Sequence, residues 1–155
     1  MTDVFSRNKR SEIMSRVKGR GNAATEMRLI TVFRQHRITG WRRQYPLFGK
    51  PDFVFPKQRL VVFVDGCFWH NCPIHGSMPT SNIAFWQIKL QRNSNRDRQV
   101  NLLLRKEGWR ILRVWQHELS EPIKVAKRID RQLLLLSSVI ANENSHEIQK
   151  VAKRS

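Results

Sequence analysis

The sequence predicts an α/β domain in which helices flank a mixed β-sheet. Three observations indicate this class. Apolar side chains recur at helical spacing near residue 30, short β-prone runs occupy residues 41–65, and a strand-like run at residues 109–115 follows a long helical segment. The predicted order is helix, three strands, helix, strand and helix, which fits one domain built around a single core.

The first 21 residues are predicted to form a basic arm. They carry six Lys and Arg against Asp3 and Glu12, and Gly19 and Gly21 stand at their end. Such a segment is expected to be flexible or weakly helical until it meets a partner.

A helix is predicted from Asn22, which can act as its N-cap, to about His36. Its apolar face carries Leu29, Ile30 and Phe33. Glu26 shares that face, and a carboxylate directed toward a core is costly unless it is paired or functional. The alternative is a Glu at the rim of the face with its carboxylate in water.

Three strands follow in the prediction. After Gly40, residues 41–47 are expected to form the first strand. Residues 52–55 and 60–65 are expected to form a hairpin, with residues 56–59 as its connection.

The remaining elements are a helix from residue 83 or 85 to about Glu107, a strand over residues 109–115, and a last helix from Pro122 through Leu136. A polar tail, residues 137–155, is expected to fray. The folded domain is therefore predicted to cover residues 22–136.

The charge of the chain points to a polyanionic partner. Its 155 residues include 29 Lys and Arg against 12 Asp and Glu, a net charge of +17 with a pI near 11.4. Nucleic acid is the expected partner, because each phosphate neutralised releases counterions; a basic but merely soluble protein is the alternative. No run approaches the roughly 20 apolar residues of a membrane span, and no signal peptide is apparent, so a cytoplasmic protein without membrane contact is expected.

Asp52, at the head of a strand beside a Pro turn, is a candidate ligand for a hard cation such as Mg²⁺. The main-chain carbonyl of Val64 on the next strand is a second candidate, and Asp65 faces the opposite side from Val64. His70 follows after a short turn and could activate water or protonate a leaving oxygen. For Asp52, the competing interpretation is a carboxylate that only caps a turn.

A second metal site is predicted from Cys67, Cys72 and His75, with His117 at the end of the last strand as the fourth ligand. Two thiolates and two imidazoles suit tetrahedral Zn²⁺ in a closed, structural site. In a reducing compartment this pattern favours metal ligation or free thiols over a disulfide. Buried thiols beside unrelated histidines are the alternative.

Aromatic side chains gather near these residues. Phe68 and Trp69 are adjacent in the Cys-rich loop, where at least one ring should be exposed, and Phe85 is assigned to the core. Aromatic wedges can enter between base steps and distort a duplex. The candidate DNA contacts on the long helix, for which a solvated face is the alternative, are Trp86, Lys89, Asn93, Arg92, Arg96 and Arg98.

These motifs together resemble the very-short-patch repair endonucleases (Vsr), which nick DNA at T:G mismatches. The resemblance covers about residues 5 to 135. It implies a restriction-endonuclease-like core, a structural zinc, and a Mg²⁺-dependent site that cuts on the 5′ side of the mispaired thymine. It further implies repair of deaminated 5-methylcytosine beside a cytosine-5 DNA methyltransferase, in bacterial cytoplasm at the nucleoid. The motifs that carry it are Pro51-Asp52-Phe53, Gly66-Cys67-Phe68-Trp69-His70, Phe85-Trp86, Lys89, Asn93, Arg96-Asp97 and Gly108-Trp109.

The resemblance assigns roles to individual residues. Asp52 matches the metal-binding aspartate and Val64 the residue whose carbonyl binds metal. His70 matches the catalytic histidine, and Glu26 the glutamate of the N-terminal helix near the site. Asp65 departs from members that carry a second active-site histidine, so it could add a metal ligand or alter the proton relay.

Two further groups are matched in the same way. The zinc-ligand positions are Cys67, Cys72 and His117, with His75 as the best fourth ligand. The wedging aromatics are Phe68, Trp69 and Trp86. The basic N-terminal segment matches an arm that clamps DNA.

Two other functions fit part of the pattern. A restriction or junction-resolving nuclease would keep Asp52 and the basic charge but would not need the aromatic residues together. A non-catalytic, zinc-stapled DNA-binding module would leave Asp52 and His70 without a role. A monomer is expected, because a mispair has no two-fold symmetry for a dimer to match.

Overall fold

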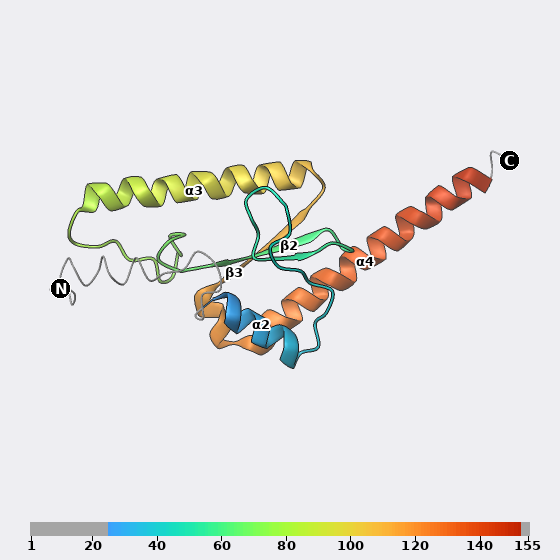
Figure 1. Cartoon of the computed structure of the whole chain (residues 1–155), viewed down its shortest axis with the longest axis horizontal. Coiled ribbons are helices and arrows are strands. Elements are labelled where there is room, and N and C mark those ends of the chain that lie inside the picture. The colour runs from blue at the N-terminus through green and yellow to red at the C-terminus, as the bar shows by residue number, and fades with distance from the viewer. Residues whose placement is uncertain (1–24, 153–155) are drawn as a thin grey trace.

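The structure is a computed structural model that describes residues 25–152 (Figure 1). The predicted basic arm and the proposed N-cap Asn22 lie outside this range. The elements, in chain order, are α2 (Glu26–Gln35), β1 (Phe53–Phe55), β2 (Leu60–Asp65), α3 (Ile83–Lys106), β3 (Arg110–Trp115), the 3-10 helix η1 (Gln116–Ser120) and α4 (Pro122–Ala152).

The sheet is mixed, as predicted, with the strand order β1-β2-β3. The hairpin strands β1 and β2 pair antiparallel, with Phe53 opposite Val62. The long α3 connection allows β3 to pair parallel with β2, with Asp65 opposite Trp115. The α/β class is therefore confirmed, whereas the restriction-endonuclease-like assignment of the core stays a prediction.

Helices cover both faces of the sheet, so the domain has three layers (Figure 1). On one face, α2 and the first turns of α4 bury Phe33 and Ile129 against the sheet residues Phe53 and Val62. On the other face, α3 buries side chains, including Leu104, against alternate residues of the same strands. The period of two along the strands divides these side chains between the two cores.

Phe33 is the centre of the larger core. Its ring is fully buried and meets Phe53 edge-to-face at 5.1 Å between centroids and Phe55 at 5.8 Å. Such pairs add about 0.5–1.5 kcal/mol each to the burial of the rings. We expect Phe33→Ala to destabilise the domain by about 3–5 kcal/mol, since the surrounding rings cannot close the space.

The prediction of a strand over residues 41–47 is wrong. This segment forms only one bridge, between Arg42 and Val54, and Gln44 has a φ of 53°. Pro46 explains the failure, because it cannot donate a ladder hydrogen bond. Instead, the segment crosses from one core to the other, with Trp41 against Phe33.

The predicted end of the last helix at Leu136 is also wrong, because α4 continues to Ala152. No Gly or Pro interrupts the sequence after Pro122, so nothing local ends the helix. Its first turns pack on the sheet, and its later part extends beyond the sheet and exposes Leu134 and Val139 (Figure 1). Among residues 25–152, no helix is both long and apolar enough to cross a bilayer.

Candidate active site and metal centre

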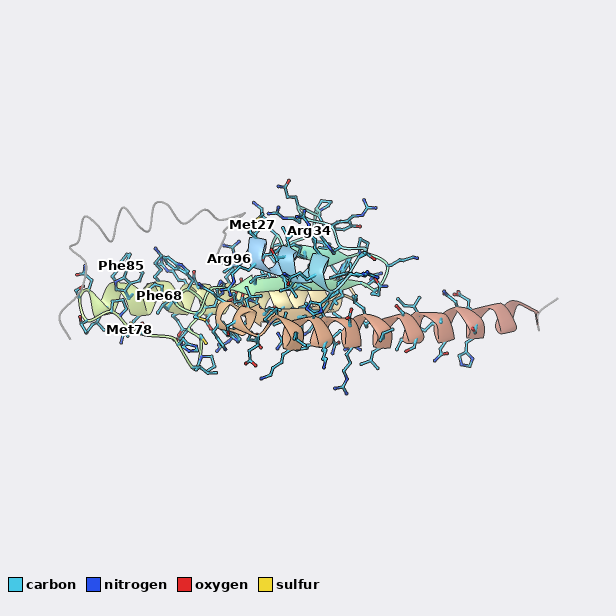
Figure 2. The ribbon with its side chains drawn as sticks, turned by 90° about the horizontal axis from the view of Figure 1, so that it is seen from below. Met27, Arg34, Phe68, Met78, Phe85 and Arg96 are labelled. Carbon is cyan, nitrogen blue, oxygen red and sulfur yellow. The ribbon has the colours of Figure 1, made fainter. Side chains whose placement is uncertain are left out.

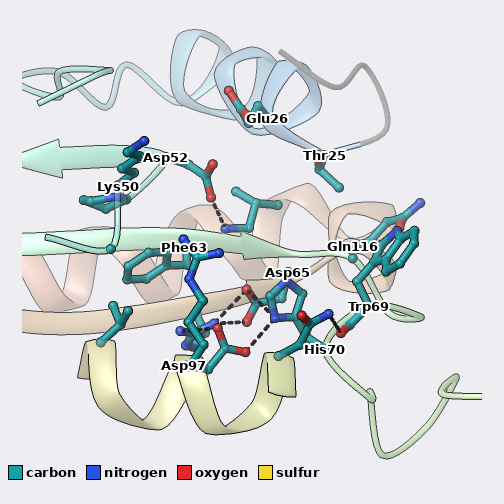
Figure 3. A pocket seen from close by; sticks show the side chains of 18 of the residues that line it. Thr25, Glu26, Lys50, Asp52, Phe63, Asp65, Trp69, His70, Asp97 and Gln116 are labelled. Carbon is teal, nitrogen blue, oxygen red and sulfur yellow. Dashed lines mark hydrogen bonds and ion pairs between the residues drawn. The ribbon is translucent and has the colours of Figure 1, made fainter. Parts of the chain in front are cut away.

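One cavity of about 590 Å³ collects most of the charged side chains predicted to be functional. It is lined by the start of α2, the turn before β1, the end of β2, the loop after it, and facing residues of α3 and β3 (Figure 3). Asp52 and His70, which the sequence analysis combined in one site, both line this cavity. Its acidic lining residues are Glu26, Asp52, Asp65 and Asp97.

The turn at Gly49 delivers Asp52 to the cavity. Gly49 has a φ of 77°, and Val100 of α3 lies so close that any side chain at this position would clash. The pair at this end of the β1–β2 ladder is Phe53 with Val62. Beyond it, the Asp52 side chain replaces a backbone acceptor, because its Oδ2 accepts a hydrogen bond from the Val64 backbone N–H at 2.8 Å. Asp52 therefore caps a neighbouring strand rather than its own turn.

Burial raises the pKa of Asp52 from 3.8 to about 6, against the lowering effect of the Val64 hydrogen bond. The negative charges of Glu26 and Asp65 raise it further. A carboxylate crowded by other acids in a desolvated cavity is a group that a bound cation would stabilise.

Glu26 lies on the buried side of α2 at 5% exposure, so the alternative of a carboxylate in water at the rim is wrong. The expected cost of its burial is offset by Arg43, whose Nη2 lies 2.6 Å from Oε2. Because Glu26 lines the same cavity as Asp52, the two carboxylates are available together.

His70 is held by carboxylates on one side of its ring. Its Nδ1 lies 2.6 Å from Oδ2 of Asp97 and 3.8 Å from Oδ1 of Asp65. An ionised carboxylate only accepts hydrogen bonds, so Nδ1 carries the proton, and in the neutral ring Nε2 holds the lone pair. Burial lowers the pKa of His70, but the hydrogen bond to Asp97 and the charges of Asp65 and Asp97 outweigh it, and the pKa lies above its ordinary value.

The four predicted zinc ligands meet at the other end of the same loop. One ligand atom from each of Cys67, Cys72, His75 and His117 lies within 4.8 Å of all the others. The Nδ1 of His117 is 3.2 Å from Sγ of Cys67 and 3.6 Å from Sγ of Cys72. Two sulfur and two imidazole donors at this mutual spacing fit a tetrahedral Zn²⁺ ion. The competing view, in which the histidines are unrelated to the thiols, does not describe this arrangement.

The aromatic residues form a cluster between the loop and the first turns of α3. Phe68 meets Trp69 at 5.1 Å and Trp86 at 5.3 Å between ring centroids. The Nζ of Lys89 lies over three aromatic rings. It is 5.2 Å from the ring centroid of Trp69, 5.5 Å from that of Trp86 and 5.6 Å from that of Phe85. A cation among three aromatic faces creates a cationic, aromatic surface.

Two predictions about this cluster need correction. Phe85, assigned to the core, is 56% exposed, whereas Trp86, chosen as a DNA contact, is only 7% exposed. The helix begins at Ile83, and its phase buries both Trp86 and Leu90. Phe85 points outward (Figure 2). The amide of Asn93 donates to the Trp69 carbonyl at 3.0 Å, so it holds the loop.

Comparison with known proteins identifies the chain at the level of family. A family model described as DNA mismatch endonuclease Vsr matches residues 2–75. Type II nicking enzyme V.XorIIP of Xanthomonas oryzae pv. oryzae is 39% identical over 125 residues, or 78% of this chain and 89% of that protein. DNA mismatch endonuclease Vsr of Escherichia coli is 35% identical over 118 residues, or 75% of this chain and 74% of that protein. This chain belongs to the Vsr family.

Another relative is more similar over a shorter stretch. Type II nicking enzyme V.NaeI of Lentzea aerocolonigenes is 58% identical over 69 residues, which are 44% of this chain and 42% of that protein. As a member of the Vsr family, the chain is a nuclease that acts on DNA, and hence a hydrolase.

The structure also brings in two residues that the sequence analysis did not assign. Asp97 and Arg113 lie beyond the stretch matched by the Vsr family model, and the fold places both at the cavity. Asp97 is one helical turn after Asn93 on α3. Arg113 shares a strand face with Trp109 and Ile111, and a single Arg on an otherwise apolar face was the signal that could have revealed it.

Proposed function

We propose that this chain is a Mg²⁺-dependent mismatch endonuclease that nicks DNA on the 5′ side of the mispaired thymine in T:G mismatches. It would thereby start very-short-patch repair of deaminated 5-methylcytosine. The observation that carries the proposal is the shared cavity: two carboxylates, Asp52 and Glu26, and the His70–Asp97 pair line one space beside the aromatic cluster.

The oxygen-rich side of the cavity suits Mg²⁺. Asp52, with its pKa raised to about 6 by burial and by neighbouring acids, and the adjacent Val64 carbonyl would hold the ion. Glu26 would lie close enough to contribute through its charge. When bound, Mg²⁺ would supply Lewis-acid stabilisation of the charge that develops on the scissile phosphate.

His70 is the group that can move a proton. Asp97 fixes its Nδ1 proton, so the lone pair of Nε2 can accept a proton from the attacking water. The protonated ring is favoured by both nearby carboxylates, which lowers the cost of that step. The negative charge of Asp65 would contribute to this stabilisation of protonated His70.

The aromatic cluster supports recognition of a weakened base pair. A T:G wobble pair costs less to open than a matched pair, so rings that enter the stack distort mismatched DNA preferentially. Phe68 and Trp69 would form the wedge, supported from behind by the buried ring of Trp86. The exposed ring of Phe85 and the ammonium of Lys89 would lie at its edge. Arg96, exposed at the cavity, would bind a phosphate.

The wider context follows from this activity. The +17 charge supports binding to the DNA backbone, and we expect a monomer in the bacterial cytoplasm at the nucleoid. Deaminated 5-methylcytosine arises where a cytosine-5 DNA methyltransferase has acted, which implies a functional link to such an enzyme.

The test uses labelled duplexes that contain either T:G or matched C:G in several cytosine-methylation contexts, each with Mg²⁺ or with EDTA. We expect single-strand cleavage of T:G duplexes only, and only with Mg²⁺. Equal cutting of matched duplexes would favour a restriction or junction-resolving nuclease. Binding without cleavage would favour a non-catalytic DNA-binding module.

A further inference from the structure

Arg113 connects Asp65, at the end of β2, to the His70–Asp97 pair. Its Nη1 lies 2.8 Å from each carboxylate oxygen of Asp65, and its Nη2 lies 3.3 Å from Oδ1 of Asp97. Nη2 also donates to Oδ1 of Asn101 at 3.2 Å. One guanidinium therefore ties β3 to the end of β2 and to two successive turns of α3.

The contacts of Asp97 show what this link does. Its two oxygens have different partners: Oδ1 faces Arg113, and Oδ2 meets Nδ1 of His70 at 2.6 Å. A carboxylate held at both oxygens cannot rotate about its last bond without losing one of them. Arg113 thus fixes the carboxylate plane that in turn fixes the imidazole.

The contacts of Asp65 show why the guanidinium stays in place. Asp65 is 3% exposed, and a buried carboxylate without a partner would cost several kcal/mol. Arg113 also stacks on Phe63, with its guanidinium carbon 4.6 Å from the ring centroid. Only the planar fork of an arginine can meet two carboxylates, an amide oxygen and a ring at once.

We propose that Arg113 is a positioning residue for His70, which acts through Asp97 and is anchored by Asp65. The inference deepens the proposed function, on which it rests for its catalytic meaning. It also assigns Asp65 a role: both of its oxygens serve Arg113, so Asp65 is an anchor rather than a metal ligand.

The first test follows His70 directly, in the protein alone and without DNA. In heteronuclear NMR spectra of protein with isotope-labelled histidine, we expect a slowly exchanging proton on Nδ1 of His70. Arg113→Met should lose this signal, as should Asp97→Asn, while circular dichroism stays unchanged. Retention of the signal in Arg113→Met would overturn the proposal.

The second test measures nicking of T:G duplex in single turnovers at saturating enzyme. Arg113→Met should slow nicking by about 100-fold, the loss expected when a reacting group moves by roughly 1 Å, with little change in DNA affinity. Arg110→Met removes the same charge from an exposed position on the same strand and should retain the wild-type rate. Equal losses in the two variants would reduce Arg113 to a general contribution of charge.

Arg113→Met could fail to fold, because it leaves Asp65 buried alone. The double variant Asp65→Asn/Arg113→Met removes both charges and should fold, yet lose the His70 signal and nick as slowly as Arg113→Met. Asp65→Asn alone should be less impaired, since Arg113 still holds Asp97. If Asp65→Asn were more impaired than Arg113→Met, Asp65 would be a metal ligand and the proposal would be wrong.

The two proposals fail separately. If the wild-type protein did not nick T:G duplex, the proposed function would fall, whereas the NMR measurement would still decide whether Arg113 positions His70.

Discussion

The metal cluster and the acidic cavity lie at opposite ends of one loop, yet they are assembled in different ways. Three of the four cluster ligands come from residues 67–75, and all four ligand atoms lie within 4.8 Å of one another. The cavity instead takes its charged groups from α2, the turn before β1, the end of β2, α3 and β3. The closed site is built by one loop and a single residue of η1, whereas the open site takes residues from every layer of the domain.

The two sites also differ in the chemistry of their side chains. Two sulfur and two imidazole donors within 4.8 Å of one another would fill all four positions of a tetrahedral ion and leave none for a substrate, which is typical of a structural site. The cavity has carboxylate oxygens, a polarised imidazole and about 590 Å³ of space, which suits a weakly held hard cation and a phosphate. Loss of the first site should therefore damage the fold, whereas loss of the second should mainly damage the reaction.

The largest effect is expected for Cys72→Ser. Cys72 is buried and its loss should release the metal, so the loop that holds His70 would lose its fixed shape. We expect about one zinc ion per wild-type chain and less in the variant. Stability should fall by about 3 kcal/mol or more, roughly 10 °C in Tm, and nicking should be lost with it. If the metal-free wild-type protein had the same Tm as the zinc-containing protein, the cluster would have no structural role.

Asp52→Ala should sharpen the contrast, because its main effect should be on the reaction and not on the fold. We expect nicking of T:G duplex to fall by about a thousandfold or more, while DNA affinity in EDTA and the circular dichroism spectrum stay unchanged. The gel-shift affinity is the control for folding and binding. Retained turnover would exclude Asp52 from the mechanism.

Trp69 lines the cavity and belongs to the aromatic cluster, so its loss should affect recognition more than the reaction. Trp69→Ala should lower the preference for T:G over C:G duplex by about tenfold, since stacking on one base is worth about 1–3 kcal/mol. The loss of affinity at low salt should be smaller. The control is Phe48→Ala, which removes an exposed ring that does not line the cavity. Equal losses on both duplexes would contradict a role in mismatch recognition.

The last expected effect has the opposite sign, a gain in stability. The pKa of Asp52 is about 6 in the folded chain against 3.8 ordinarily, so the folded state binds this proton more tightly. The ionised form therefore costs stability: the cost is absent below about pH 4, grows as the pH rises to 6 and is complete above 6.

In EDTA at pH 7.5, Asp52→Asn should therefore be more stable than the wild-type protein by about 1–3 kcal/mol, and this difference should vanish at pH 4. Added Mg²⁺ should stabilise the wild-type protein and not the variant. The control is Glu143→Gln, an exposed change on α4. A wild-type protein more stable than Asp52→Asn at pH 7.5 in EDTA would contradict the crowding of acids in the cavity.

Local patterns predicted much of this molecule. The hairpin, α3 and β3 were predicted from alternating or helically spaced apolar residues and from Gly108, which ends the helix. Their bounds lie within a residue or two of the predicted ones. The grouping of Cys67, Cys72 and His75 was likewise predicted from their spacing, and His117 was added because it stands at a strand end. Pro46, in contrast, breaks a strand-like run, and its missing N–H should have excluded a strand there.

The features that were missed depend on contacts between distant segments. The packing of α3 on the loop sets the helical phase that buries Trp86 and exposes Phe85. Both residues are large aromatics, so the sequence alone did not show which of them faces inward. Asp97 and Arg113 become partners only because β3 lies parallel to β2 beneath α3. The sequence could have drawn attention to Arg113, but its pairing with Asp97 could be found only after the layers were in place.

The parallel pairing of β2 with β3 also has a consequence for incorrectly folded copies of this nuclease. A slip of β3 by one residue would turn Arg113 to the opposite face of the sheet and draw His117 away from the thiols. Both centres would be lost in the same event. A misregistered molecule would keep the positive charge that attracts DNA, but it would lack the assembled site.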